Sequence, residues 1–194
     1  MNPKKLIEIL NIAENLKNNT RHSWTSKNRH ESIAEHSWRL SLMAYFIKDE
    51  FKDVDINKVI LMCILHDIGE AFTGDIPAFE KNECHELTEK NEIDKWLDSL
   101  PEPYNNELKE LFKEMNELET KESKLCKALD KLETLIQHNE APISTWLPLE
   151  YDLQLTYGEK ETQFSSYLKN LRNEINNDSL KKIKESKIKI IRKS

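Results

Sequence analysis

Apolar residues recur at helical spacing along most of the chain, and this periodicity constrains the fold more than any other feature. One segment has apolar positions at Ile33, Trp38, Leu42 and Phe46 or Ile47. No alternation of apolar and polar residues typical of a strand extends over a useful length. Only three glycines and six prolines interrupt the 194 residues, so helices can run long. We therefore predict an all-α fold.

The expected helices are placed by this periodicity and by helix-stop residues. They lie near residues 3–18, 32–51, 57–70, 80–98, 104–118, 120–138, 159–176 and 178–190. The length fits a single domain, residues 1–194, with one substantial core. Within it, residues of about 20–140 would hold the functional core and residues of about 159–190 the C-terminal helices.

Two segments lack a clear helical pattern. Residues 19–31 read as a polar loop that leads to a helix cap at Ser32, and we expect this loop to cover the functional core and to contact a substrate. Residues 139–158 are expected to be an irregular stretch packed on the body of the domain. Its apolar anchors are Trp146, Leu149 and Tyr151.

The segment CILHDIGEAFTGD places imidazole and carboxylate groups directly after an apolar run. Residues 59–65 would be an ordinary buried segment, so the polar groups that follow need a partner or a metal if they are buried too. On a helix, His66 and Glu70 lie one above the other, and Asp67 is rotated by roughly 100°. A cation held by His66 and Asp67 would therefore have Glu70 beside it. Imidazole and carboxylate ligands suit Mn, Fe, Co, Ni or Zn.

Further ligands must come from distant sequence. His36 is the best-placed histidine, because it lies inside a second amphipathic segment, ESIAEHSWRLSLMAYFI. Asp130 lies at the edge of an apolar face in SKLCKALDKLETLIQ, and alone it would mean nothing. In chain order, the candidate ligands are His36, His66-Asp67 and Asp130.

This order of a histidine, a His-Asp pair and a distant aspartate resembles the HD superfamily of metal-dependent phosphohydrolases. The strings RHSW, ESIAEHSWRL, HDIGEAFTGDIP and KALDKLE, over roughly residues 20–140, are similar to those of the bacterial 5'-deoxynucleotidases and their eukaryotic HD-domain relatives. The resemblance implies a single-domain HD-fold helical bundle with one metal site between helices. It also implies a homodimer, and exposed apolar residues on the later helices could supply the interface.

The resemblance assigns a role to each residue of the motif. The ligands that it implies for one divalent metal ion, which could be Mn, Co, Ni, Fe, Zn or Mg, are His36, His66, Asp67 and Asp130. Glu70 would activate the attacking water. Asp75, after Gly74, matches a second acidic position near the sugar and the water. Arg21 matches a basic residue near the phosphate, a role that a guanidinium suits through bidentate hydrogen bonds.

The residues after Arg21 bear on the choice of substrate. The best-known bacterial members have an arginine followed by a tryptophan near the sugar, whereas this chain has Arg21-His22 and then Trp24, which resembles the Arg-x-Gly-Trp arrangement of the other branch. Trp24 either contacts the substrate or packs the loop. Deoxyribonucleoside 5'-monophosphates are expected by analogy, but a ribonucleotide or another small phosphate ester would fit the same ligands.

The number of histidines favours a single catalytic metal. Two-metal members of the superfamily, including di-iron oxygenases, use additional histidines between the His-Asp pair and the final aspartate, where this chain has only His85. His22 is not expected to face the site. His30 and His138 are interpreted as surface residues.

Charge and cysteine usage bound the partners and the compartment. A net charge of −6 argues against a general binder of nucleic acid or of anionic membranes. The basic final segment LKKIKESKIKIIRK is expected to pack its isoleucines, Ile183, Ile188, Ile190 and Ile191, on the domain. The cysteines have no CxxC spacing, and we see no signal peptide or membrane-length apolar run, so we expect a cytoplasmic protein.

The combined interpretation is a phosphomonoesterase that acts on nucleoside 5'-monophosphates, with deoxyribonucleotides as the expected small-molecule substrates. Two alternatives stay open. Another HD-fold hydrolase would act on a nucleotide pyrophosphate, a signalling nucleotide or a non-nucleotide phosphate ester, and product analysis would separate it. A helical binding or scaffold protein with a structural metal would be unaffected by Glu70→Ala.

Overall fold

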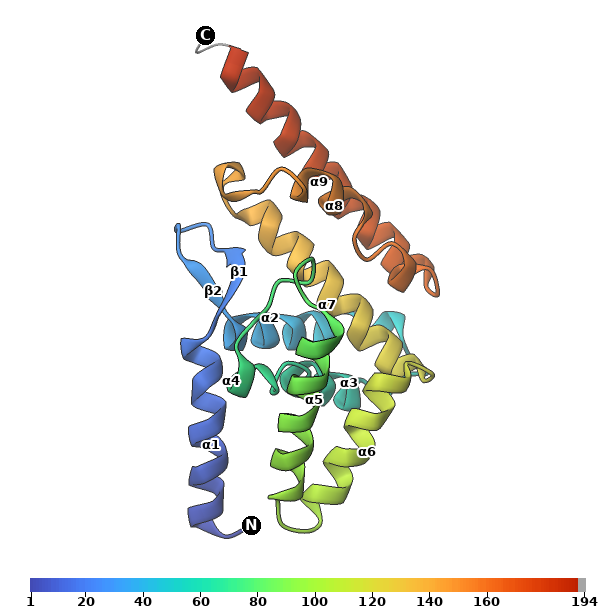
Figure 1. Cartoon of the computed structure of the whole chain (residues 1–194). Helices are drawn as coiled ribbons and strands as arrows, with labels where there is room; N and C mark the ends of the chain where they lie inside the picture. The colour runs from blue at the N-terminus through green and yellow to red at the C-terminus, as the bar shows by residue number, and fades with distance from the viewer. Residues whose placement is uncertain (192–194) are drawn as a thin grey trace. The chain divides into compact units, whose positions relative to one another are not determined.

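Helices make up most of the chain in the computed structural model, which describes the backbone of residues 1–191 and the side chains of residues 1–186 (Figure 1). The longer helices are α1 (Pro3–Asn18), α2 (Ile33–Phe46), α3 (Ile56–Leu65), α5 (Glu83–Asp98), α6 (Tyr104–Glu117), α7 (Lys121–Glu140) and α9 (Ser166–Ile191). The shorter elements are β1 (Thr20–Trp24), β2 (His30–Ser32), α4 (Glu70–Thr73), α8 (Glu150–Thr156) and the 3-10 turns η1 (Lys48–Glu50), η2 (Ile143–Thr145) and η3 (Lys160–Thr162). No helix in the described part of the chain is long and apolar enough to cross a membrane.

The chain divides into two compact units. Unit 1 comprises Met1–His22 and Glu31–Cys126, and unit 2 comprises Ser23–His30 and the chain from Lys127 onward. The expected domain limits, with a functional core at 20–140 and C-terminal helices at 159–190, stay a prediction.

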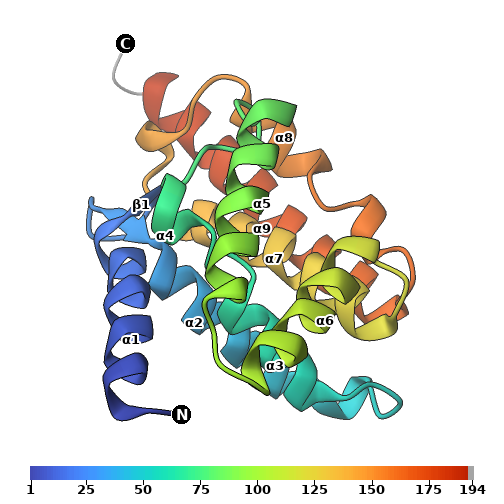
Figure 2. The ribbon, with the colours of Figure 1, turned by 60° about the horizontal axis from the view of Figure 1, so that its bottom comes forward.

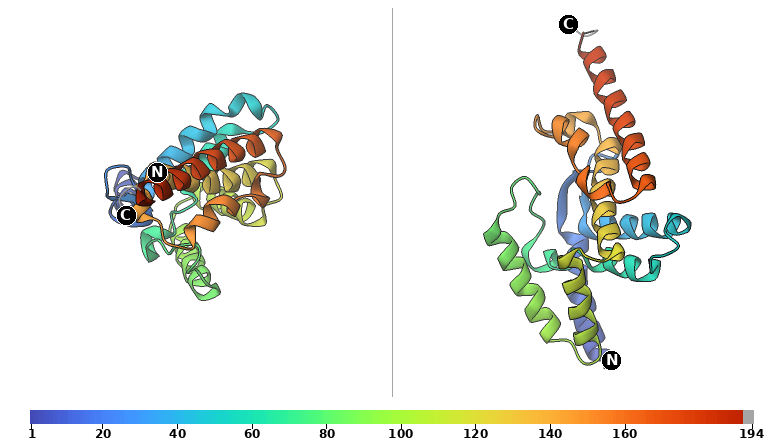
Figure 3. Two further views of the ribbon diagram at one scale, coloured as in Figure 1. Left: turned by 90° about the horizontal axis from the view of Figure 1, so that it is seen from above. Right: turned by 90° about the vertical axis from the view of Figure 1, so that its right-hand side faces the viewer.

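Unit 1 is built on the antiparallel pair α2 and α3, which pack against each other (Figure 2). Helix α1 packs on α2 and on the short α4, and α5 packs on α4 and α6; α5 and α6 run antiparallel (Figure 3, right, green and yellow-green). The apolar side chains that these helices bury together are Leu16, Ile33, Ile68, Ala71, Trp96, Leu97, Leu100 and Phe112. Because Ile68 and Ala71 belong to this core, the segment between α3 and α4 is fixed against α1 and α5.

Side-chain caps set where the helices of unit 1 begin. Ser32 caps α2 as predicted, since its hydroxyl accepts from the Glu35 N–H and the Glu35 carboxylate accepts from the Ser32 N–H. Asp55 caps α3, and Asn82 caps α5 by accepting from two backbone N–H groups. The position of His36, four residues after the cap, follows from this fixed start of α2.

The predicted loop at 19–31 is a hairpin instead, so two short strands accompany the helices of the predicted fold. Strands β1 and β2 pair through a tight turn in which the Asn28 N–H donates to the Thr25 carbonyl at 3.2 Å. Asn28 has a φ of 58°, a left-handed conformation that asparagine tolerates well. The strands are too short for an alternating pattern to reveal them.

The predicted apolar face of α2 was only half right. The side chains that α2 buries are Ile33, His36, Ser37, Leu40 and Ala44. Ile33 and Ile47 are buried as predicted, whereas Trp38, Leu42 and Phe46 are 62%, 37% and 76% exposed. The buried side of α2 includes a histidine, a serine and an alanine, and a pattern of large apolar residues does not predict that such residues are buried.

The helix expected at 57–70 ends early, at Leu65. Beyond it the backbone tightens into turns in which the Ile68 N–H donates to the Leu65 carbonyl and the Glu70 N–H donates to the Asp67 carbonyl, both at 3.0 Å. Glu70 therefore begins a separate helix, α4, rather than standing one turn above His66 on the same helix.

In unit 2, α8 packs on α9, and buried polar side chains link them to α7 (Figure 1). The Gln154 amide donates to the Ser179 hydroxyl at 3.0 Å and to the Leu135 carbonyl at 2.9 Å. The helix break expected between 176 and 178 does not occur, because α9 runs unbroken from Ser166 to Ile191. Of the four C-terminal isoleucines, Ile183 is half-buried. The other three side chains, Ile188, Ile190 and Ile191, lie outside the described residues.

The stretch at 139–158 is more regular than expected, since it contains η2 and α8. Trp146 is a buried anchor as predicted, and its indole N–H donates to the His138 carbonyl at 3.0 Å. Leu149 is not an anchor, because it is 43% exposed. His138 was wrongly placed on the surface: its side chain is 13% exposed and lies 3.7 Å from the Glu150 carboxylate.

Candidate metal centre

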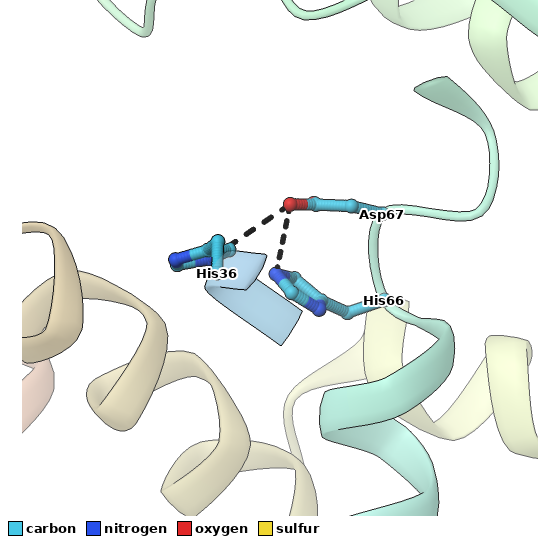
Figure 4. Close-up of side chains that lie close together, drawn as sticks. All are labelled: His36, His66 and Asp67. Atoms are coloured by element: carbon cyan, nitrogen blue, oxygen red, sulfur yellow. Dashed lines mark ion pairs between the residues drawn. The ribbon is translucent and has the colours of Figure 1, made fainter. Parts of the chain in front are cut away.

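Three of the predicted ligands meet in unit 1. His36 projects from the first turn of α2, His66 directly follows α3, and Asp67 is the next residue (Figure 4). The Asp67 Oδ2 atom lies 3.0 Å from His66 Nε2 and 3.8 Å from His36 Nε2. All three ligand atoms lie within 4.8 Å of one another. Two imidazole nitrogens and a carboxylate oxygen so close together form a candidate site for a divalent metal ion.

The environment of His66 supports metal binding. Its Nδ1 lies 2.9 Å from the Cys63 carbonyl oxygen, which can only accept, so Nδ1 carries the hydrogen. The Nε2 atom then faces the Asp67 carboxylate, and two lone pairs 3.0 Å apart repel unless a proton or a metal ion lies between them. A backbone carbonyl that fixes the tautomer of a histidine is a common companion of metal ligation. The residues present therefore fit a metal ion.

Asp67 is held ionised by its neighbours. The Arg21 Nη1 atom lies 3.1 Å from its Oδ2 atom. Although burial opposes ionisation, the imidazole of His66, followed by Arg21 and His36, holds the pKa of Asp67 well below its usual range. Asp67 thus offers a carboxylate, the form that a metal requires.

Glu70 stands at the start of α4, and α1 orients the turn that carries it. The side-chain amides of Asn19 and Asn15 donate to the carbonyls of Glu70 and Ala71, at 2.7 and 3.0 Å. The Glu70 carboxyl is buried, and its Oε2 atom has no hydrogen-bond partner among the residues that the structure describes. Burial, and then the charges of Asp67 and Asp75, raise the pKa of Glu70 to about 9. This carboxyl therefore holds a proton readily, and a nearby cation would favour its ionised form.

Asp75 and Arg21 complete the group of charged residues in unit 1. Asp75 accepts from the His22 N–H of β1 at 3.2 Å, so it is tied to the strand that carries Arg21. Burial chiefly raises the pKa of Asp75, and Arg21 opposes the rise. Gly74, just before it, has a φ of 76°, which only glycine adopts without strain. The His22 ring meets the edge of Phe79, with 5.6 Å between ring centroids.

Sequence reasoning missed two charged residues of this group. Glu31 is buried on β2, with its Oε2 atom 3.7 Å from Arg21 Nε. It was missed because the hairpin that sets it opposite Arg21 was not predicted. Lys81 donates to Glu89 at 2.6 Å, and nothing in the local sequence distinguishes it from other lysines of this acidic region.

The remaining predicted site residues, Trp24 and Asp130, belong to unit 2. The Trp24 ring lies against His30, with centroids 4.1 Å apart, so His30 is half-buried rather than on the surface. Asp130 forms ion pairs with Lys127 and Lys131 at 3.5 and 3.4 Å. Their roles as a substrate contact and as a fourth ligand stay predictions.

The match to the HD domain family extends over residues 13–172, most of the chain. This protein belongs to the HD-domain family. The human 5'-deoxynucleotidase HDDC2 is 32% identical to this HD-domain protein over 142 residues, which cover 71% of the chain and 68% of the human protein. The Dictyostelium discoideum 5'-deoxynucleotidase HDDC2 is 30% identical over 145 residues, which cover 69% and 76%. The predicted relationship to HD-domain metal-dependent phosphohydrolases is thereby confirmed.

Two solved structures confirm the HD fold. A predicted metal-dependent phosphohydrolase from Magnetospirillum magnetotacticum matches with a TM-score of 0.77, at 24% identity and over 92% of both chains. An HD-domain phosphohydrolase from Listeria innocua matches with a TM-score of 0.71, at 20% identity and over 97% and 99% of the two chains. At these identities the likeness concerns the fold alone.

Proposed function

We propose that this HD-domain protein is a metal-dependent 5'-deoxynucleotidase, which hydrolyses deoxyribonucleoside 5'-monophosphates to the nucleoside and inorganic phosphate. The relatives named 5'-deoxynucleotidase support this substrate class. The observation that carries the proposal is the contact between Arg21 and Asp67 at 3.1 Å. A guanidinium suited to phosphate lies directly beside the carboxylate of a candidate metal site.

His36, His66 and Asp67 would hold the metal ion, with Asp130 proposed as a fourth ligand. When bound, a divalent metal supplies Lewis-acid chemistry, which polarises a phosphoryl oxygen and lowers the pKa of a water molecule. One metal ion is proposed, because the histidines needed for a complete second site are lacking between His66 and Asp130.

Glu70 is the proposed general base. Its buried carboxyl oxygen accepts the proton of the attacking water, whose oxygen forms the new bond to phosphorus while the bond from phosphorus to the nucleoside O5' breaks. The leaving O5' takes up a proton from solvent. A raised pKa makes Glu70 a stronger base than an exposed carboxylate once a cation beside it has favoured the ionised form.

Arg21 and Asp75 are proposed to position the substrate. Arg21 is already oriented by Asp67 and Glu31, so little side-chain entropy is lost when it binds a phosphate oxygen. Asp75 is proposed to accept a hydrogen bond from a sugar hydroxyl. Trp24 is proposed to contact the sugar or the base.

The test measures phosphate release from deoxy- and ribonucleoside 5'-monophosphates, with pyrophosphates and non-nucleotide esters alongside. The protein is stripped of metal and then supplied with Mn, Co, Ni, Zn, Fe or Mg. Glu70→Gln should keep bound metal and lose activity by about 10²- to 10⁴-fold, as expected for a lost general base. His66→Ala should lose both metal and activity.

Glu114→Gln is the matched control, because Glu114 is a partly buried carboxylate of unit 1 that binds Lys58 and Thr120. This variant should keep full activity. Release of pyrophosphate or of a different product would point to another HD-fold hydrolase, and an unchanged rate in Glu70→Gln would refute the assignment of the base.

A further inference from the structure

The loop between α4 and α5 carries a cation that the proposed mechanism has not used. We propose that Lys81 is a substrate-binding residue, which binds the phosphate group of the monoester together with Arg21. This inference rests on the proposed function, because a phosphate ester is the assumed ligand.

Close packing around Gly69 fixes where Lys81 lies. A Cβ atom at Gly69 would lie 2.7 Å from Glu89 Cγ and 2.8 Å from Ile93 Cδ1. The Glu89 side chain therefore rests directly on the backbone of the turn between Asp67 and Glu70. The Glu89 carboxylate accepts from Lys81 Nζ at 2.6 Å. The Lys81 ammonium thus binds the side chain that packs on the turn carrying Asp67, a proposed ligand, and Glu70, the proposed base.

The other end of the same loop is tied to the strand of Arg21. Asp75 accepts from the His22 N–H, and Phe79 contacts the His22 ring. The Lys81 N–H donates to the Pro77 carbonyl at 3.0 Å, which closes a turn just before α5. The loop from Asp75 to Lys81 is therefore anchored both to β1 and to α5, and Lys81 is preorganised rather than mobile.

The charges around this turn leave a role for a second cation. Asp67, Glu70, Asp75 and Glu31 are acidic, and Arg21 already contacts two carboxylates. The proposed divalent metal ion would offset two of these negative charges and Arg21 a third, so a dianionic phosphate monoester would still bind better with a further positive charge near it. Lys81 has three N–H donors, of which Glu89 takes one.

The state of Lys81 also suits this role. Its side chain is 27% exposed, so the ammonium is partly desolvated and can still be reached by a ligand. Although burial opposes protonation, the bond to Glu89, with the charges of Glu70 and Asp67, raises the pKa of Lys81. It therefore stays cationic at every pH at which the enzyme would work.

In the alternative, the Lys81–Glu89 ion pair has only a structural role and joins the loop to α5. The variants that separate the two are Lys81→Gln, Lys81→Met and Lys81→Arg in the full chain loaded with metal. The matched control is Lys95→Gln, because Lys95 forms an ion pair of the same 2.6 Å length with Glu92 on the exposed side of α5.

The measurements are inhibition constants for inorganic phosphate and for the deoxynucleoside, KM and kcat for the monophosphate, direct phosphate binding by calorimetry, and Tm. Lys81→Gln and Lys81→Met should weaken phosphate binding and raise KM by about tenfold, the loss expected for one charge-assisted hydrogen bond. Binding of the deoxynucleoside should not change. Lys81→Arg should recover most of the phosphate affinity, and Lys95→Gln should behave as the parent protein.

Two results would overturn the proposal and leave the Lys81–Glu89 ion pair with a structural role only. One is that Lys81→Gln and Lys81→Met bind phosphate as tightly as the parent protein. The other is that they lose phosphate affinity and nucleoside affinity equally. The calorimetric arm needs no turnover, so it decides the role of Lys81 even if no nucleotide is hydrolysed. A protein that hydrolyses none of the monophosphates refutes the proposed function, whereas one that binds no phosphate refutes the role of Lys81.

Discussion

Replacement of Gly69 by alanine tests whether Glu89 packs on the turn of the candidate metal centre. The backbone at this position is right-handed, with φ −58° and ψ −33°, so alanine itself is well tolerated and would by propensity stabilise the turn by up to about 1 kcal/mol. The new methyl group would, however, lie 2.7 Å from Glu89 and 2.8 Å from Ile93. Overpacking of this kind typically costs about 1–3 kcal/mol. The expected net effect is a loss of about 0–3 kcal/mol.

Urea unfolding at equilibrium measures this loss, and the Glu89→Ala background supplies the control. Removing the Glu89 side chain leaves room for the methyl group on that side, so Gly69→Ala should cost less in the Glu89→Ala background than in the parent protein. Gly69→Ala should also weaken phosphate binding, because the displaced Glu89 carries Lys81 with it. A Gly69→Ala protein more stable than the parent, with no coupling to Glu89→Ala, would refute the packing on which this reasoning rests.

Two further predictions concern pH and assembly. Because the pKa of Glu70 is raised to about 9, the folded metal-free protein keeps a proton that the unfolded chain releases above about pH 4.5. The free energy of unfolding should therefore fall as the pH rises from about 4.5 to about 9. Chemical denaturation at several pH values measures this slope, which Glu70→Gln should remove. The exposed Trp38 and Phe46 of α2 could supply the interface of the homodimer that the family resemblance implies. The double variant Trp38→Gln, Phe46→Gln should then convert a dimer to a monomer in light scattering. A dimer of unchanged mass would place the interface elsewhere, for example on the later helices as expected from sequence.

The sequence predicts those parts of the site that depend on local order. His66 and Asp67 are adjacent, and their place after an apolar helix follows from the chain alone. His36 was found because it lies inside an amphipathic segment and because the order His36, His66-Asp67, Asp130 matches a family pattern, although half of the apolar face assigned to its helix was wrong. That error has a physical cause, since α2 buries a histidine and small residues against α3 and exposes Trp38 and Phe46.

Contacts between distant segments could not be predicted in the same way. Glu31 reaches Arg21 only through a hairpin whose strands are too short to recognise. Lys81 and Gly69 have no unusual sequence context, and their importance depends on Glu89, which lies on another helix. Such residues become visible when tertiary packing is known, because the constraint is steric and not a matter of spacing.

The end of α3 at Leu65 separates the orientation of His66, the proposed ligand, from that of Glu70, the proposed base. On one continuous helix, His66 and Glu70 would move together, and any shift of the ligand would shift the carboxyl as well. In the folded chain, the Cys63 carbonyl orients His66, whereas the side-chain amide of Asn19, the residue after α1, donates to the carbonyl of Glu70. Asn19→Ala should therefore lower kcat with little effect on metal affinity. A variant that shifts the Cys63 carbonyl away from His66 should lower both kcat and metal affinity.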